Sequence, residues 1–364
     1  MLVAIVGGGQ LGQMLALAGI PLGHRFRALD PSASAPAGMA CEQIVGAYDD
    51  PEALDRLVDG ADVLTYEFEN VPVEAVRTVE RRVPVLPSPT SLERTQDRLA
   101  ERAVFEEAGF RTARYAPAAT QEELARALDV TGLPAVVKIR RLGYDGKGQA
   151  VIRAPQDVEP AWRALGGAPA IVESFVEFRR ELSIVAVRGR DGSCATYPLV
   201  ENTHRDGILR LSRAPATTST DIRDEAEAGV LRVLGRLEHV GVLTIELFET
   251  VDGLVANEIA PRVHNSGHWT IEGAETSQFE NHVRAVTGMP LGSTDPIGHS
   301  AMVNLIGALP DPAAVAAISG AHLHLYGKEP RPGRKLGHVT IRSQDAEGLR
   351  GPALKVEDLA TDHG

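Results

Sequence analysis

The sequence predicts an α/β fold for the N-terminal part of the chain and an α+β fold for the rest. Three observations lead to this prediction. Over the first 90 residues, apolar runs alternate with amphipathic segments across short connections, which is typical of a parallel α/β unit. From about residue 112 this alternation is lost. From about residue 290 the sequence predicts a small strand-rich segment.

The N-terminal elements follow from apolar runs of strand length and from segments with helical spacing. Strands are predicted at 2–6, 25–30, 61–69 and 83–86, and helices at 10–23, 51–60 and 73–82. A Pro/Ser-rich stretch at 86–91 marks a boundary. One helix is predicted to follow at 91–109, with Ser91 as its N-cap and Gly109 as its stop.

The remaining elements are predicted in the same way. A strand at 135–140 leads into a glycine-rich loop, and a strand–loop–strand unit covers 170–189. A long helix at 221–241 precedes a strand pair within 242–269. Three further strands are predicted at 322–327, 337–343 and 353–358.

Composition excludes several classes of protein. The net charge of −12 opposes attraction to nucleic acid or anionic membrane, and 4% aromatic residues are few for a base-stacking surface. No apolar run reaches the 18 residues that a membrane span needs. The apolar N-terminus predicts a buried strand rather than a signal peptide. Cys41 and Cys194 lie far apart, so we expect reduced thiols and a cytoplasmic protein without nucleic-acid or membrane partners.

The first motif is Gly7-x-Gly9-x-x-Gly12, between the first strand and its helix. This spacing is expected where a dinucleotide pyrophosphate lies on a helix N-terminus. Asp30 follows 18 residues after Gly12, where a dehydrogenase would place a ribose-binding acid. A dehydrogenase is therefore one hypothesis, although it leaves the glutamates and basic residues described below without a role.

The stretch "KIRRLGYDGKGQ" is a second glycine-rich loop. Lys138 ends a strand, and Lys147 lies among three glycines, Gly143, Gly146 and Gly148. Glycines let backbone N–H groups close around phosphate oxygens while lysines supply opposing charge. The alternative is an ordinary β-hairpin turn; the order of residues excludes a Walker loop.

Acidic residues in otherwise apolar surroundings form the next candidates. In "IVESFVEFRRE", a hinge after Glu173 offers backbone groups to an adenine edge, and Glu181 offers a carboxylate to ribose; the alternative is solvated glutamates at a strand end. Glu246 and Glu258 interrupt two buried runs, with Asn257 beside them. Because a buried carboxylate is costly without a cation, this pair favours Mg²⁺.

The turn between these strands decides whether the pair converges. A two-residue Asp252–Gly253 loop would place Glu246 opposite Ile259. A three-residue loop, 251–253, would pair Thr250 with Leu254 and place Glu246 opposite Glu258. The metal chemistry selects the three-residue loop, unless a bulge farther along corrects the shorter one.

Two further groups are candidates for substrate contacts. Glu67 and Glu69 share one face at the carboxyl end of a predicted strand, where parallel sheets bind ligands. "YGKEPRPGRKLGH" is a candidate phosphate site, with solvated turn residues as the alternative; it gathers Lys328, Arg331, Arg334 and Lys335.

Taken together, the motifs resemble one family. "GGGQLGQML", "TYEFENV", "KIRRLGYDGKGQ", "YPLVENTHRDGI", "NEIAPRVHNSGHWT" and "RPGRKLGH" resemble the N5-carboxyaminoimidazole ribonucleotide synthetases of the ATP-grasp superfamily, over residues 1 to about 345. The resemblance implies an ATP-grasp fold with domains at 1–100, 101–290 (with a lid at about 112–175) and 291–364. It implies a ligase that carboxylates 5-aminoimidazole ribonucleotide with ATP and bicarbonate, and a homodimer.

The resemblance also implies residue roles. Arg262 and Asn265 would steady the transferred group, with Lys138 and Asp145 also at the reacting centre, and Glu246 and Glu258 would bind Mg²⁺. The nucleotide would contact Arg98, Lys138, Gly143, Tyr144, Asp145, Gly146, Lys147, Gly148, Gln149, Glu173, Ser174, Phe175, Val176, Glu181, His204, Asn257 and Glu258. The ribonucleotide phosphate would contact Lys328 with Arg334 or Lys335, and Tyr144, Asp145 and one of Glu67 or Glu69 would lie nearer the imidazole.

Two alternatives remain beside this family. One is another ATP-grasp ligase, such as an enzyme that uses formate in place of bicarbonate. The other is a regulator that binds nucleotide without turnover, which the presence of Lys138 and both metal carboxylates disfavours.

Overall fold

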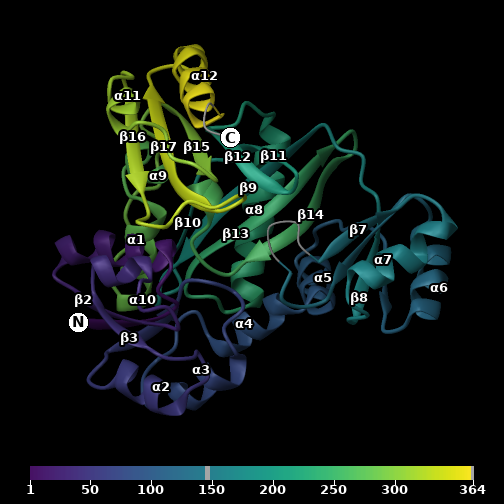
Figure 1. Ribbon diagram of the computed structural model, residues 1–364, viewed down its shortest axis with the longest axis horizontal. Helices are drawn as coiled ribbons and strands as arrows, with labels where there is room; N and C mark the ends of the chain where they lie inside the picture. Colours follow the sequence, from purple (N-terminus) through teal and green to yellow (C-terminus); the bar gives the residue numbers. More distant parts are fainter. Residues whose placement is uncertain (144–147, 362–364) are drawn as a thin grey trace.

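The computed structural model describes residues 1–143 and 148–361, in three sheets (Figure 1). The predicted site residues Tyr144, Asp145, Gly146 and Lys147 lie outside the described residues. In Figure 1 the N-terminal part is purple, the C-terminal strands are yellow, and a small helix-covered sheet lies at the right.

The N-terminal sheet is parallel, with strand order β3-β2-β1-β4. Its elements are β1 (Leu2–Val6), α1 (Gln10–Gly19), β2 (Arg25–Asp30), β3 (Glu42–Val45), α2 (Pro51–Val58), β4 (Val63–Tyr66) and α3 (Val73–Glu80). The predicted strand at 83–86 was wrong: it is a single bridge between Leu64 and Val85. β3 was not predicted, because Ile44 is its one buried residue and gives no clear apolar pattern.

The predicted helix at 91–109 is two helices, α4 (Pro89–Gln96) and α5 (Arg98–Glu107). The chain breaks at Asp97, whose backbone is extended and whose carboxylate accepts a hydrogen bond from Leu99 N at 3.0 Å, as an N-cap. Ser91 was also wrongly predicted as a cap. Ser88 caps α4, and Ser91 instead bonds to His239.

A small antiparallel sheet, ordered β5-β8-β6-β7, occupies the predicted lid region. It comprises β5 (Tyr115–Ala118), α6 (Gln121–Thr131), β6 (Ala135–Ile139), β7 (Gln149–Ile152), α7 (Val158–Ala164) and β8 (Ala170–Ser174). β6 and β7 pair on either side of the glycine-rich loop, and α6 and α7 pack on one another. Its own buried core includes Leu124, Val137 and Val172.

The large sheet continues into the C-terminal part, because β12 pairs with β15. Its order is β14-β13-β9-β11-β12-β15-β17-β16, with β10 beside β9. The strands are β9 (Arg180–Arg188), β10 (Cys194–Thr196), β11 (Val200–Arg205), β12 (Ile208–Ala214), β13 (Gly241–Thr250), β14 (Gly253–Ala260), β15 (His299–Ile306), β16 (Ala321–Leu325) and β17 (Lys335–Ser343).

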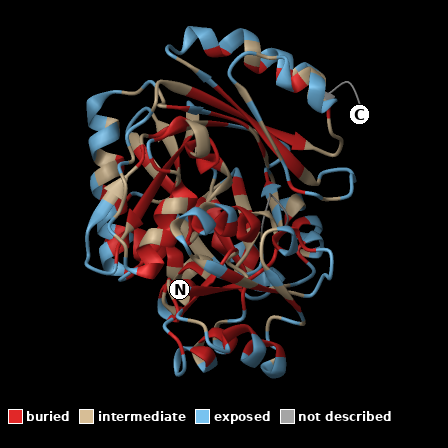
Figure 2. Cartoon of the chain, turned by 90° about the vertical axis from the view of Figure 1, so that its left-hand side faces the viewer, coloured by how far each residue is buried: buried red, intermediate tan, exposed pale blue. Residues whose placement is uncertain are grey.

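Helices cover this sheet, and buried residues follow its strands (Figure 2). They are α8 (Thr220–Arg236), α9 (Thr270–Gly273), α10 (Gln278–Thr287), α11 (Pro312–Ala316) and α12 (Glu347–Thr361). The predicted strand at 353–358 was wrong, since it lies within α12. Leu349, Ala353 and Val356 are its buried residues, and their spacing is helical. None of the helices in the described ranges is both long and apolar enough for a membrane span.

Candidate active site

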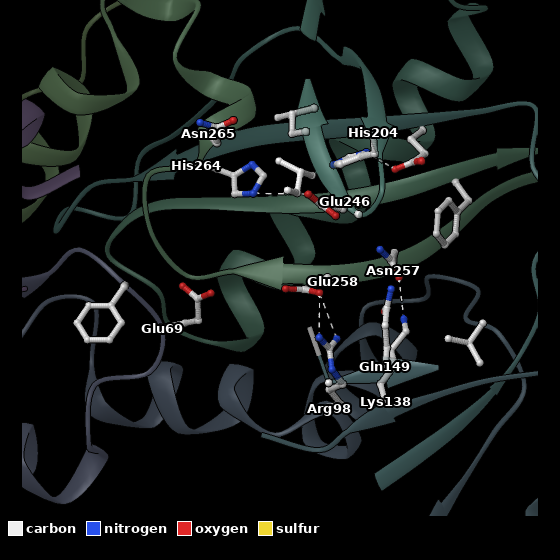
Figure 3. A pocket seen from close by; sticks show the side chains of 18 of the residues that line it. Glu69, Arg98, Lys138, Gln149, His204, Glu246, Asn257, Glu258, His264 and Asn265 are labelled. Carbon is white, nitrogen blue, oxygen red and sulfur yellow. Dashed lines mark hydrogen bonds and ion pairs between the residues drawn. The ribbon is translucent and has the colours of Figure 1, made fainter. Parts of the chain in front are cut away.

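A cavity of about 1260 Å³ lies where the parts of the chain meet. Its walls come from the start of α1, from the loop after β4, from β6–β8, from β13 and β14, and from residues 328–335. Every described residue predicted for the site lines this cavity except Gly143. Figure 3 shows Glu246 and Glu258 facing one another at its centre, with Glu69 on one side and Lys138 on the other.

The two predicted metal carboxylates are directly paired. Glu246 of β13 lies opposite Glu258 of β14, so the predicted pairing is confirmed. The predicted turn was wrong: Thr250 pairs with Gly253, which leaves a two-residue loop. A bulge corrects the register, because Leu247 pairs with Ala256 while Glu246 pairs with Glu258.

The bulge also changes which side chains reach the cavity. Side chains of neighbouring residues in a regular strand point to opposite faces. Asn257 is the extra residue, and both Asn257 and Glu258 line the cavity. An amide and a carboxylate from consecutive residues thus face the same ligand space.

The electrostatics of the pair fit a divalent cation. Burial and the charge of Glu258 raise the pKa of Glu246 to about 7, although His204 opposes the shift. Arg98 lies 3.2 Å from Glu258 through both terminal nitrogens. Within the described ranges, no three His, Cys, Asp or Glu side chains form a complete metal site. An ion between the two carboxylates would therefore take further oxygens from a ligand such as a nucleotide phosphate.

A buried ion-pair network fixes the predicted phosphate lysine. Lys138 Nζ lies 2.7 Å from one oxygen of Glu173, and Arg102 Nε lies 3.0 Å from the other. Although burial raises it, these two charges hold the pKa of Glu173 at about 2. Lys138 also donates to Asn257 Oδ1 at 3.2 Å. The carboxylate of Glu173 therefore orients Lys138, and the hinge predicted for adenine begins where that carboxylate is anchored.

An apolar slot beside the hinge was missed in the sequence. The rings of Phe178 and Phe248 stack with centroids 4.6 Å apart, and Val136 and Val255 line the cavity near them. The signal was weak, because Phe178 and Phe248 lie 70 positions apart and each follows other apolar residues. A flat, apolar slot beside the hinge suits a purine base.

Two histidines lie next to the acidic residues. His204 Nδ1 is 2.5 Å from Glu181; burial lowers its pKa, but this hydrogen bond and the charge of Glu246 raise it above the usual value. His264 Nε2 is 3.5 Å from Glu246, and burial with the charge of Arg262 lowers its pKa. Sequence reasoning missed His264, although it lies between the predicted residues Arg262 and Asn265.

The structure shows what the first glycine motif does. The carboxylate of Glu67 accepts hydrogen bonds from Gly9 N at 2.5 Å and from Gly12 N at 2.7 Å. Asp30 accepts one from Gly8 N at 2.9 Å. The N-terminus of α1, where a dinucleotide pyrophosphate would bind, is thus occupied by the protein's own carboxylate. This arrangement disfavours the dehydrogenase hypothesis.

At the far end of the cavity, acidic and basic side chains pair. Arg262 forms an ion pair with Glu69, and Asn265 donates to Asn304 Oδ1 at 3.1 Å. Lys328 donates to Gln10, and burial with the nearby Arg334 and Lys335 lowers its pKa to about 8. Several cations gathered at one end of a cavity would favour a phosphate.

Comparisons with known proteins agree with this geometry. Residues 1–96 match the ribonucleotide synthetase preATP-grasp domain, residues 103–279 the ATP-grasp domain, and residues 300–351 the phosphoribosylaminoimidazole carboxylase C-terminal domain. The N5-carboxyaminoimidazole ribonucleotide synthase of Pseudomonas aeruginosa is 52% identical over 359 residues, 99% of each chain.

Solved structures agree as well. The N5-carboxyaminoimidazole ribonucleotide synthetase of Thermus thermophilus matches with a TM-score of 0.95 and 53% identity, over 100% of this chain and 99% of that one. The enzyme of Aspergillus clavatus in complex with ADP and 5-aminoimidazole ribonucleotide matches with a TM-score of 0.92 and 30% identity, over 99% and 98%. This chain belongs to the N5-carboxyaminoimidazole ribonucleotide synthase family, with the ATP-grasp fold.

Proposed function

We propose that the protein uses ATP and bicarbonate to carboxylate 5-aminoimidazole ribonucleotide, giving N5-carboxyaminoimidazole ribonucleotide, ADP and phosphate, in purine biosynthesis. The observation that carries the proposal is one cavity holding a paired carboxylate centre, a phosphate lysine and a separate basic cluster. The family's Aspergillus clavatus member was solved with ADP and the same ribonucleotide.

The nucleotide would occupy the end of the cavity next to β6–β8. The base would enter the slot at Phe178 and Phe248, with backbone of Ser174 to Val176 at its edge and Glu181 at the ribose. Arg98 and Lys138 would contact the phosphates, with Gly148 and Gln149 closing over them. His204 and Asn257 would line the same space.

The acidic pair fits Mg²⁺, because two facing carboxylates are costly without a cation and leave positions for phosphate oxygens. When bound, the ion would neutralise charge on the phosphates during transfer. Glu246 and Glu258 would hold it, and Arg98 would keep Glu258 in place.

The transfer needs two steps. A bicarbonate oxygen attacks the γ-phosphorus, the bond to the bridging oxygen breaks, and ADP leaves carboxyphosphate behind. The amine of the ribonucleotide then attacks the carboxyl carbon, loses a proton and expels phosphate. Positioning and charge neutralisation dominate such chemistry. Arg262 and Asn265 line the cavity and would steady the transferred group.

The ribonucleotide would take the other end. Its phosphate would contact Lys328 with Arg334 or Lys335, and Arg331 lines the same wall. Glu69 lines the cavity in an ion pair with Arg262, whereas both carboxylate oxygens of Glu67 accept hydrogen bonds from the glycine turn. Tyr144 and Asp145, predicted near the imidazole, belong to the undescribed loop. We also propose a homodimer, after the family resemblance, acting in the cytoplasm, where ATP and bicarbonate are available.

A direct assay tests this function. Purified protein should release ADP when Mg²⁺ and the ribonucleotide are both supplied, and should incorporate labelled bicarbonate into an acid-labile product. Formate in degassed buffer is the matched comparison, because a formate-dependent ligase would use it instead. Equal ADP release with formate and no carboxylated product would refute the proposal.

A further inference from the structure

The bulge in β14 is held from outside the sheet by two side chains of α5. β14 is the edge strand of the large sheet, so its outer backbone groups need other partners. Ala256 N donates to Arg111 O at 2.8 Å, and Arg102 and Glu101, each 1% exposed, supply the further partners around the bulge. Arg102 lies in the cavity wall, but at this exposure its guanidinium contacts the protein rather than open ligand space.

Arg102 contacts the carbonyl groups on both sides of the bulge. Its guanidinium donates to Ala256 O at 3.0 Å and to Asn257 O. Successive carbonyl groups of a regular strand point to opposite edges, so one side chain reaches both at a bulge but not in a continuous ladder. The contact is thus specific for the bulged conformation.

Glu101 contacts the backbone on the far side of the bulge. Its carboxylate accepts a hydrogen bond from Ile259 N at 2.6 Å, and its other oxygen lies 3.3 Å from Arg102. The backbone on either side of Glu258 is therefore fixed by one buried pair. Removing the bulge would return Glu258 to the register in which it faces away from Glu246.

The same guanidinium reaches the phosphate lysine. Its Nε lies 3.0 Å from Glu173, whose other oxygen lies 2.7 Å from Lys138. The terminal nitrogens of the planar guanidinium donate to Ala256 O, Asn257 O and Glu101 while Nε lies in ion-pair contact with Glu173, whereas a lysine ammonium is a single point charge. The position therefore requires arginine rather than positive charge alone.

We infer that Arg102, oriented by Glu101, is a positioning residue for the reaction: it fixes the β14 bulge that turns Glu258 toward Glu246, and through Glu173 it fixes Lys138. The inference rests on the proposed function, because it assigns the acidic pair to the metal and Lys138 to phosphate. It predicts an effect on metal binding rather than on binding of the ribonucleotide, whose phosphate is assigned to the basic residues at 328–335.

The test substitutes Arg102→Lys and measures Mn²⁺ binding to the ADP-saturated protein by electron paramagnetic resonance. Loss of such a supporting contact should weaken Mn²⁺ binding about 10-fold or more. It should also lower kcat and leave the KM for the ribonucleotide unchanged. Arg94→Lys is the matched control, because Arg94 pairs with Glu107 at the surface of the same helix pair and should behave as wild type.

If Arg102 only stabilised the fold, part of the variant protein would be unfolded. The number of Mn²⁺ sites would then fall, but the dissociation constant for Mn²⁺ at the folded protein would not change. Wild-type Mn²⁺ affinity in Arg102→Lys would overturn the inference, as would equal weakening of ADP binding without metal. If Arg102→Lys does not fold, Glu101→Gln replaces it as the test variant. This change keeps the shape of the side chain and should weaken Mn²⁺ binding to a smaller extent. Unchanged Mn²⁺ affinity of Glu101→Gln would overturn the inference. Failure of the proposed function is separate, because it appears as wild-type protein without ribonucleotide-dependent ADP release.

Discussion

At the scale of single residues, Glu258 is the side chain on which the proposed chemistry depends most. It faces Glu246 across the strand pair and accepts from Arg98. Glu258→Gln keeps the size of the side chain and removes one charge from the proposed metal site. We expect turnover to fall by at least ~100-fold, as for loss of a major electrostatic contact in a transition state.

Turnover of Glu258→Gln measured across a Mg²⁺ series, with circular dichroism to confirm the fold, checks this prediction. Glu249→Gln is a useful comparison, since Glu249 lies on the same hairpin and pairs with Arg180. Near-normal turnover of Glu258→Gln at low Mg²⁺ would show that this carboxylate is not a metal ligand.

Sequence reasoning located residues better than it assigned their partners. Glu246 and Glu258 could be predicted because a carboxylate inside an apolar run needs an explanation. The role of Glu67 could not, because its partners are the backbone N–H groups of Gly9 and Gly12, 55 or more positions away. Arg102 gave no signal either, since its partners on β8 and β14 lie far along the chain.

At the scale of elements, the turn from β1 into α1 is built around Glu67. A Cβ atom on Gly9 would lie 2.3 Å from Oε1 of Glu67, closer than atoms can approach. The φ of Gly9 is −71°, so the backbone itself would accept alanine. Gly9→Ala therefore tests the approach of the carboxylate rather than backbone strain.

We expect Gly9→Ala to lower the free energy of unfolding by about 1–3 kcal/mol, in the range of overpacked sites. Gly235→Ala in α8 is the control, because a Cβ there meets nothing within 4 Å. Gly235 is in the last turn of α8, so alanine there should stabilise by at most about 0.5–1 kcal/mol, the value for a mid-helix position. Thermal unfolding of the two variants measures both changes in stability. Equal stability of Gly9→Ala and wild type would contradict the close approach of Glu67 to this turn.

The boundary between α4 and α5 is set by tertiary contacts rather than by the local sequence pattern. The apolar spacing in 91–109 continues through Asp97, so a single helix was the natural prediction. Asp97 is extended because its carboxylate caps α5 and also pairs with Arg140 and Arg141 near the glycine-rich loop. Those two partners lie 43 and 44 positions away, beyond the reach of a local pattern.

At the scale of the whole molecule, the N-terminal part, the central strands and the C-terminal strands are joined by shared strands and buried hydrogen bonds. The C-terminal strands extend the large sheet, which the alternation of elements could not reveal because β12 and β15 are far apart in the sequence. Two buried histidines join the N-terminal part to this sheet: His239 bonds to Ser91 and His282 bonds to Thr65.

Both histidines are held in the neutral form. His239 Nε2 lies 3.0 Å from Val242 O, to which it can donate, and His282 Nδ1 accepts from Val242 N at 3.1 Å. Burial lowers the pKa of His239 to about 4 and that of His282 to about 3. Adding a proton would place a charge in a buried site and remove an acceptor at each ring.

This arrangement predicts a loss of stability in acid. The folded pKa values lie below the unfolded value of about 6.5, so the unfolded chain binds more protons between these limits. The stabilisation is fully present above pH 6.5 and is lost as the pH falls toward 4 and 3. Between pH 8 and pH 5, each histidine should lower the free energy of unfolding by about 2 kcal/mol.

The midpoint of thermal unfolding, recorded from pH 8 to 5, should fall accordingly. His239→Gln keeps a donor and an acceptor but does not titrate, so its midpoint should depend less on pH than that of wild type. His322→Gln, at an exposed position of β16, should follow wild type. If His239→Gln kept the full pH dependence of wild type, the acid sensitivity would have to come from groups other than His239.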